Sequence, residues 1–300
     1  MPWFFPFFCF LLSFLLCPLL IRLSPVVGGM DLPDGVRKTH ARPTPRLGGM
    51  AFFFSFFLSS LLFLPGDEKT LALLFFGLLL LLSGFLDDTR TLSVRKKLLF
   101  QTVASGGVLL VCGVPREIVV SSRAIPLPLP IAFPIFLFYT VALINAVNFT
   151  DGADGLAAAG VLPALLSLSL LFSFSGGGKD ALPPLFLFFA LLGFLPFNRA
   201  PARLFMGDAG SQFLGFALAH FTLGAEVFPL SRLLFAALPL ADLCVTVGGR
   251  LRRGVSPFTA DRTHLHHRLA ARGASVWEIV FFAAAFSFAA AMLGVSLSFL

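Results

Sequence analysis

Two adjacent carboxylates are the first residues in this sequence whose type and spacing could do chemistry. Asp87 and Asp88 end an apolar run, and the basic residues Arg95, Lys96 and Lys97 follow shortly after. Adjacent carboxylates raise each other's pKa, and they can hold a divalent cation or accept a proton from a nucleophile. Because two negative charges at the C-terminus of a helix oppose its dipole, a purely structural role explains the pair poorly. We therefore predict that both carboxylates are catalytic.

The segment from Asn145 to Gly155 combines amides, carboxylates and glycines. Residues three apart on a helix differ by about 300°, so Asn145, Asn148 and Asp151 fall within an arc of about 120° if the preceding helix continues that far. Hard oxygen ligands of this kind suit Mg²⁺ better than zinc. Asp-Gly turns joining two membrane helices would explain the glycines but not the two asparagines. We predict a face rich in oxygen ligands, with Asp154 close by.

Asp208 lies at the start of another apolar run, within Arg203-Leu-Phe-Met-Gly-Asp-Ala-Gly-Ser. This position predicts that it is the N-cap of a helix. The same helix start gathers free N–H groups and the positive end of a dipole, which could bind a phosphate that arrives with its metal. Gly207 and Gly210 leave room for such a ligand. Both a capping role and a site role remain open for Asp208.

Three histidines lie in the most basic loop, which reads Asp261-Arg-Thr-His-Leu-His-His-Arg. His264, His266 and His267 are crowded, and no fourth ligand is evident nearby, so a zinc site is a weak interpretation. Histidine and Arg262 together suit a polyanion such as a diphosphate. The alternative is a solvated basic loop.

A rigid cationic stretch, from Arg37 to Gly49, precedes the second apolar run and contains Lys38 and His40. Its position at the membrane surface suits the phosphate head of a lipid whose tail stays in the bilayer. The alternative is a positive anchor that only sets the orientation of the chain.

The elements that must position these residues are membrane helices. The chain has 300 residues, of which 57% are hydrophobic and 12% charged, and its mean hydropathy is +0.93. A globular chain carries about 25% charged residues, so a polytopic membrane protein of the all-α class is indicated. Apolar runs long enough to cross a bilayer predict ten helices, near residues 3–23, 48–65, 69–86, 98–114, 131–147, 155–175, 181–197, 210–228, 230–248 and 276–298. No internal repeat divides the chain, so residues 1–300 form one membrane domain.

The distribution of charge predicts the orientation. Of the 22 Lys and Arg residues, 17 lie in the odd-numbered connections between these helices and 5 in the even-numbered ones, and 8 of the 15 acids also lie in the odd connections. Because basic residues accumulate in cytoplasmic loops, we expect the odd connections and the site to be cytoplasmic and both termini to be outside. The net charge of +7 then reports cytoplasmic loops and anionic lipid, and not nucleic acid.

The five segments, in this order and with this topology, resemble the polyprenyl-phosphate N-acetylhexosamine-1-phosphate transferases of glycosyltransferase family 4. The similarity extends from about residue 31 to residue 269 through RKTHARPTPRLGG, LDD with RKKLLFQ, NAVNFTDGADGL, LFMGDAGS and DRTHLHHRL. It implies ten or eleven transmembrane helices in the bacterial cytoplasmic membrane. The implied reaction moves a sugar 1-phosphate from a UDP-N-acetylhexosamine to polyprenyl (undecaprenyl) phosphate, with Mg²⁺ or alternatively Mn²⁺, and releases UMP. Membrane lipid surrounds such a protein, and a homodimer is left open.

The His-Leu-His-His form resembles the branch that uses UDP-N-acetylglucosamine to start O-antigen, teichoic acid or exopolysaccharide synthesis. The alternative is the branch of phospho-N-acetylmuramoyl-pentapeptide transferases in peptidoglycan synthesis, which usually has three consecutive histidines there. A transporter or flippase is an alternative of another class. It would place acids near the bilayer midplane, for which only His220, Asp242 and Glu278 are candidates.

The resemblance also implies roles for individual residues. Asp208 corresponds to the principal Mg²⁺ ligand and Asn148 to the amide that joins it. Asp87 corresponds to an acid that deprotonates or positions the lipid phosphate, with Asp88 as its partner, and Lys97 corresponds to a phosphate-binding lysine.

The remaining implied roles concern the donor. Phe205 corresponds to an aromatic residue that stacks on uracil. The nucleotide and its diphosphate would be contacted by Asp151, Asp154, Arg262, His264, His266 and His267. Asp34 departs from the Asn that relatives often have, which leaves contacts of the first loop less defined.

Overall fold

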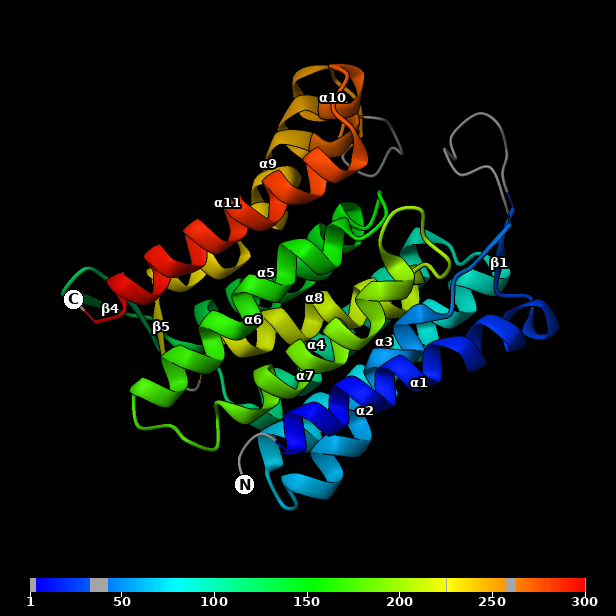
Figure 1. The fold of residues 1–300 in the computed structure, drawn as a ribbon. Coiled ribbons are helices and arrows are strands. Elements are labelled where there is room, and N and C mark those ends of the chain that lie inside the picture. The colour runs from blue at the N-terminus through cyan, green and yellow to red at the C-terminus, as the bar shows by residue number, and fades with distance from the viewer. Residues whose placement is uncertain (1–3, 33–42, 225, 257–262, 300) are drawn as a thin grey trace.

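The computed structural model describes residues 4–32, 43–224, 226–256 and 263–299. Most of these residues belong to a bundle of membrane-length helices (Figure 1). Lys38 and His40 of the first cationic loop and Arg262 of the histidine loop lie outside the described residues, as do Asp34 and Asp261. Their predicted roles stay predictions.

Each of the ten predicted ranges falls on a helix, which confirms the all-α class. The structure adds one short helix, α10, that the sequence analysis did not predict. The helical elements are α1 (Phe4–Val27), α2 (Gly48–Phe63), α3 (Glu68–Arg90), α4 (Val94–Cys112), α5 (Leu129–Thr150), α6 (Leu156–Phe174), α7 (Leu182–Asn198), α8 (Gly207–Leu223), η1 (Leu230–Ala236), which continues into α9 (Ala237–Arg252), α10 (Leu265–Ala271) and α11 (Val276–Leu297).

Six of the described helical segments are long and apolar enough to cross a bilayer: α1, α3, α5, α6, the η1–α9 unit and α11. The shorter helices α2 and α7 are also apolar. A helix needs about 20 predominantly apolar residues to span the hydrocarbon core. The chain is therefore a multi-pass membrane protein, while the number of ten spans stays a prediction.

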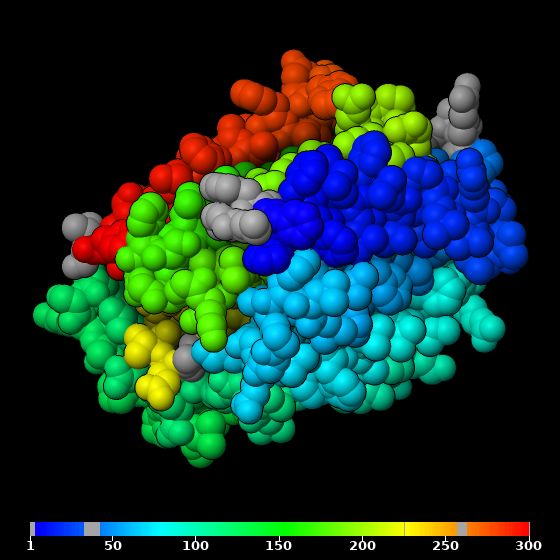
Figure 2. All heavy atoms as spheres, turned by 60° about the horizontal axis from the view of Figure 1, so that its bottom comes forward, coloured from blue at the N-terminus to red at the C-terminus, as the bar shows by residue number. Residues whose placement is uncertain are grey.

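Helix α8 forms the centre of the bundle. It packs against α3, α5 and α2, and nearly all of its residues from Ala209 onwards are buried. Neighbouring helices therefore cover α8 on nearly all sides. The peripheral helices differ, because α1 and α11 expose phenylalanines and leucines on the outside of the bundle, such as Phe7, Leu15 and Phe281. In the space-filling view α1, α2 and α3 lie side by side on one face (Figure 2).

Two small sheets, which the sequence analysis missed, tie connections together at the two ends of the bundle. Strands β1 (Met30–Asp31) and β2 (Thr44–Pro45) pair antiparallel. At the other end, β3 (Glu117–Val120) pairs antiparallel with β4 (Arg123–Pro126) and parallel with β5 (Val227–Pro229). These strands of two to four residues carry no hydrophobic alternation long enough to be recognised in a sequence.

The start of α1 and the end of α11 lie at the same end of the bundle, on the left in Figure 1. The ends of α3, α5 and α9 lie at the opposite end, and the predicted site residues Asp87, Asp88 and Asn148 belong to the last turns of α3 and α5. This arrangement agrees with an even number of crossings.

Candidate active site

The N-terminus of α8 is held by a carboxylate from another helix. The Asp88 carboxylate, in the last turn of α3, accepts hydrogen bonds from Asp208 N at 3.0 Å and from Ala209 N at 3.1 Å. These are two of the free N–H groups that every helix start leaves without an intrahelical partner. Asp88 therefore caps α8 from outside and fixes the end of α3 against it.

The prediction that Asp208 caps α8 is wrong. Met206 occupies the N-cap position, and Asp208 is the second residue of the helix. Asp88 accepts hydrogen bonds from two of the N–H groups at this helix start, and the predicted phosphate site there stays a prediction. The Asp208 side chain is left to interact with α4 and α5.

Gly207 is required at the turn before Asp208. Its φ is +71°, and an added Cβ would lie 2.3 Å from the Arg46 carbonyl oxygen and 2.6 Å from Asp88 Oδ2. The segment before it is fixed by backbone hydrogen bonds, from Phe205 N to Pro45 O at 2.7 Å and from Gly48 N to Phe205 O at 2.9 Å. Phe205 itself is half-buried at the edge of the site.

A lysine lies between two carboxylates next to this cap. Lys97 Nζ, in the first turn of α4, lies 2.9 Å from Asp208 Oδ2 and also pairs with Asp87 Oδ2. The other oxygen of Asp87 accepts a hydrogen bond from Leu92 N at 2.5 Å. The structure thus brings Asp87, Asp88, Lys97 and Asp208 together as predicted, and with Asn148 we call them the carboxylate–lysine cluster.

Asn148 joins the cluster from the last turns of α5. Its amide nitrogen donates to Asp208 Oδ1 at 3.1 Å and to Ser211 Oγ at 2.8 Å. The residue predicted to share a metal with Asp208 therefore contacts it directly, through its nitrogen in this structure.

A buried ladder of amides continues from the cluster into the bundle, and sequence analysis missed most of it. Gln212 Nε2 lies 3.5 Å from Asp208 Oδ2, Gln101 Nε2 donates to Gln212 Oε1 at 3.3 Å, and Asn145 Nδ2 donates to Gln101 Oε1 at 2.7 Å. A signal was present, since Gln101 and Gln212 each follow a cluster residue by four positions and so share its helix face. The ladder supports the carboxylate–lysine cluster from the interior of the bundle.

The two carboxylates of the loop after α5 behave differently. Asp151 is half-buried, and no side-chain hydrogen bond joins it to the other described residues. Burial, followed by the negative charges of Asp208 and Asp88, raises its pKa well above the usual range. Asp154 instead accepts a hydrogen bond from Ala202 N at 2.8 Å and so anchors the loop that follows α7. Asp151 is therefore near enough to Asp208 and Asp88 to be affected by their charges, and Asp154 shapes the loop.

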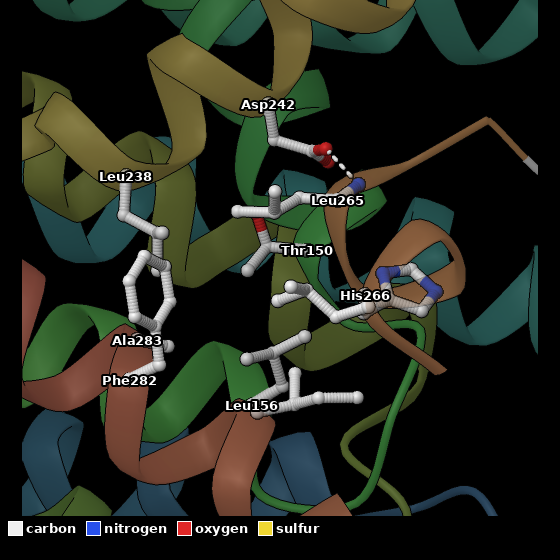
Figure 3. A pocket seen from close by; sticks show the side chains of 10 residues that line it. Thr150, Leu156, Leu238, Asp242, Leu265, His266, Phe282 and Ala283 are labelled. Carbon is white, nitrogen blue, oxygen red and sulfur yellow. Dashed lines mark hydrogen bonds between the residues drawn. The ribbon is translucent and has the colours of Figure 1, made fainter. Parts of the chain in front are cut away.

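A second group, which we call the histidine cluster, consists of Asp242, His264, His266 and His267. Asp242 Oδ2 lies 3.0 Å from His264 Nδ1. Asp242 Oδ1 accepts a hydrogen bond from Leu265 N at 2.6 Å, which Figure 3 shows as a dashed line. The rings of His264 and His266 are nearly parallel, with centroids 5.9 Å apart, and the His266 and His267 centroids are 4.1 Å apart. Burial, with a smaller contribution from His267, lowers the pKa of His266 to about 4, so this ring is neutral at physiological pH.

The end of α5 joins the two clusters. Phe149, the residue after Asn148, packs on the His264 ring at a centroid distance of 4.9 Å, and the buried Arg250 guanidinium lies 5.6 Å from the centre of the Phe149 ring. Gly152 lies directly against the His266 ring, since a Cβ there would be 2.3 Å from His266 Cε1. Successive residues of one segment thus contact the carboxylates on one side and the imidazoles on the other.

The donor chemistry of the carboxylate–lysine cluster fits Mg²⁺. In the part of the chain that the structure describes, no three His, Cys, Asp or Glu side chains converge as a ready ligand set. The cluster does offer hard oxygen donors, from Asp87, Asp208 and the Asn148 amide, and no thiol or imidazole, which is the preference of Mg²⁺. The Lys97 ammonium bridges Asp87 and Asp208, which marks the space between these carboxylates as a position for a cation.

Comparison with known proteins agrees with this geometry. Residues 70–226 match the family model described as glycosyl transferase family 4. A probable undecaprenyl-phosphate N-acetylglucosaminyl 1-phosphate transferase of Bacillus subtilis is 30% identical over 87% of this chain and 75% of the relative. A decaprenyl-phosphate N-acetylglucosaminephosphotransferase of Mycobacterium tuberculosis is 34% identical over 81% of this chain and 70% of the relative. A phospho-N-acetylmuramoyl-pentapeptide-transferase of Staphylococcus saprophyticus is 33% identical over 72% of this chain and 75% of the relative.

Proposed function

The chain belongs to glycosyl transferase family 4, and from this premise we propose that it transfers N-acetylglucosamine 1-phosphate from UDP-N-acetylglucosamine to undecaprenyl or another polyprenyl phosphate, with release of UMP. The observation that carries the proposal is the carboxylate–lysine cluster at the ends of membrane helices, where Lys97 bridges Asp87 and Asp208. Such a place is reached both by a lipid phosphate from the bilayer and by a nucleotide from water. The product would start the synthesis of a cell-envelope polysaccharide.

The reaction is a substitution at phosphorus. An oxygen of the lipid phosphate bonds to the β-phosphorus of the donor, while the bond from that phosphorus to the α–β bridging oxygen breaks, and UMP leaves with the bridging oxygen. Phosphoryl transfer depends mainly on positioning and charge neutralisation. Because a phosphate monoester is largely ionised at neutral pH, the nucleophile needs little base catalysis.

Asp208 and Asn148 would hold Mg²⁺, with Asp87 beside them, and the ion would supply positive charge that neutralises the phosphates and the departing UMP. Lys97 would bind a phosphate oxygen through its ammonium group. Asp88 positions Asp208 by capping α8. Asp87 positions the lipid phosphate or takes its last proton.

The histidine cluster would receive the diphosphate of the donor. His264, His266 and His267 present a stack of imidazoles across the end of α5 from the carboxylates. Arg262 would also contact the diphosphate, whereas Lys38 and His40 would bind the lipid phosphate; all three lie outside the described residues. Phe205 would stack on the uracil ring. We further propose that the site faces the cytoplasm, that the protein lies in the bacterial cytoplasmic membrane, and that both termini are outside.

The competing function is transfer of phospho-N-acetylmuramoyl-pentapeptide, since relatives named for that reaction are also similar to this chain. A transporter is less well supported, because Asp242 contacts His264 within the cluster and Glu278 belongs to a capping box at the start of α11. Purified protein with undecaprenyl phosphate and Mg²⁺ should release UMP from UDP-N-acetylglucosamine in preference to other UDP-N-acetylhexosamines and to UDP-N-acetylmuramoyl-pentapeptide. A preference for the pentapeptide donor would overturn the choice of sugar, and no UMP from any donor would overturn the proposed function.

A further inference from the structure

A buried carboxylate lies behind the histidine cluster, in a place where the proposed reaction has no direct use for it. Asp242 is on α9 and is 4% exposed, and His264, at the start of α10, is 8% exposed. Burial of an ionised carboxylate is costly unless donors compensate its charge. Leu265 N donates a hydrogen bond to one Asp242 oxygen at 2.6 Å, and His264 Nδ1 lies 3.0 Å from the other.

The contacts on the other sides of the His264 ring leave it little freedom. Phe149 packs on it at a centroid distance of 4.9 Å, and His266 lies nearly parallel at 5.9 Å. Thr246 Oγ1, one turn along α9 from Asp242, lies 3.3 Å from the same Nδ1 atom. The ring is therefore fixed in place by α5, α9 and α10 together.

We propose that Asp242 is a positioning residue that holds the proton of His264 on Nδ1 and so leaves Nε2 as the ring atom for the donor diphosphate. A carboxylate oxygen can only accept, so the Nδ1 partner of Asp242 must carry the hydrogen. A second proton taken by the ring then goes to Nε2, where it makes a charge-assisted hydrogen bond to a phosphate oxygen while Asp242 balances the positive charge. This inference rests on the proposed function, because it assigns the diphosphate to His264.

The variant Asp242→Asn separates this role from a structural one. Its Oδ1 atom still accepts the Leu265 N–H, so the start of α10 keeps its hydrogen bond. The Asn side chain places an N–H donor where the Asp242 oxygen accepted from His264 Nδ1. The proton of the His264 ring then moves to Nε2, and the negative charge that balanced the ring is lost. Carboxylates that orient the histidines of metal sites typically contribute about 10- to 100-fold to activity, and we expect a loss of the same order here.

The experiment is a double-mutant cycle on UMP release, with the full-length protein, Asp242→Asn, His264→Ala and the double variant. We expect Asp242→Asn to lower kcat/KM for the UDP-sugar about 10- to 100-fold, with KM for undecaprenyl phosphate unchanged. In the His264→Ala background the same substitution should change kcat/KM by less than about 2-fold, since the residue through which Asp242 acts is gone. Equal losses in both backgrounds, or no loss in the wild-type background, would overturn the inference.

A second measurement does not depend on whether Asp242→Asn folds. In wild-type protein labelled with ¹⁵N-histidine, the signal that disappears in His264→Gln should show a protonated Nδ1 atom. An unprotonated Nδ1 atom would also overturn the inference. Inactive wild-type protein would count against the proposed function, while the NMR result would still decide the position of the proton.

Discussion

The carboxylate–lysine cluster and the histidine cluster handle charge in opposite ways. The first is built at the ends of the central helices α3, α4, α5 and α8, where several carboxylates face a single lysine. The second lies on α9 and α10 at the edge of the bundle, where Asp242 pairs with one imidazole and the neighbouring His266 ring is neutral.

This difference indicates which substrate group belongs to which region. The carboxylate–lysine cluster has more negative than positive side chains. It is therefore suited to a metal ion and to the phosphate that comes with it. A stack of imidazoles with one charge partner is suited to hydrogen bonding with an anion that is already partly neutralised. Substitutions in each region should therefore affect different substrates.

Asp208→Asn should have the largest effect. The substitution keeps the shape of the side chain but removes the negative charge that a metal requires, so we expect UMP release to fall by at least about 10³-fold at every Mg²⁺ concentration. The matched control is Asp67→Asn, at the opposite end of α3, where the carboxylate accepts a hydrogen bond from Thr70 N. Asn caps a helix almost as well, so this variant should keep full activity. If excess Mg²⁺ restores the activity of Asp208→Asn, Asp208 is only an auxiliary ligand of the metal.

Lys97→Gln should come next. It removes the positive charge between Asp87 and Asp208, and we expect kcat/KM for the lipid phosphate to fall by about 10²-fold, with a weaker effect on the UDP-sugar. Lys96→Gln, one position earlier and exposed, should behave as wild type. If both lysine variants lose activity equally, the effect comes from the general charge of the loop and not from the cluster.

Gly152→Ala should uncouple the two clusters. The new Cβ would meet the His266 ring at 2.3 Å, so the ring must move, and we expect activity to fall by about 10-fold or more. Gly248→Ala is the control, because a Cβ at that position meets no atom within 4 Å. In a His266→Ala background the clash disappears, so the Gly152→Ala substitution should then have little further effect. A full loss there would show that Gly152 matters for another reason.

The smallest expected effect concerns stability, and it depends on the charge of His266. Its pKa is lowered to about 4 in the folded protein, whereas an unfolded chain takes up the proton near pH 6.5. The unfolded state therefore binds more protons between these values, and stability falls as the pH drops from about 6.5 to 4. The thermal midpoint of wild-type protein in detergent should decrease by roughly 5 °C more than that of His266→Gln between pH 7 and pH 5. If the thermal midpoints of wild type and His266→Gln decrease by the same amount, the pKa of His266 is not lowered in the folded protein.

Sequence analysis predicted the ten helices and most of the site, because long apolar runs and charged helix ends carry their own signal. It placed Asp87, Asp88, Lys97, Asn148 and Asp208 in one site, and the structure brings them together. It was wrong about the cap of α8, because the capping carboxylate comes from Asp88, 120 positions away in the chain, and local spacing cannot report such a contact. It missed the pairing of Asp242 with His264 for the same reason.

The most direct test of the central claim follows the phosphate. The protein is incubated with undecaprenyl phosphate, Mg²⁺ and UDP-N-acetylglucosamine that carries ³²P in its β-phosphate. We expect the label to enter the lipid fraction and unlabelled UMP to be released in equal amount, and we expect Asp208→Asn to lose both. Label that remains in UDP while the sugar alone reaches the lipid would contradict it.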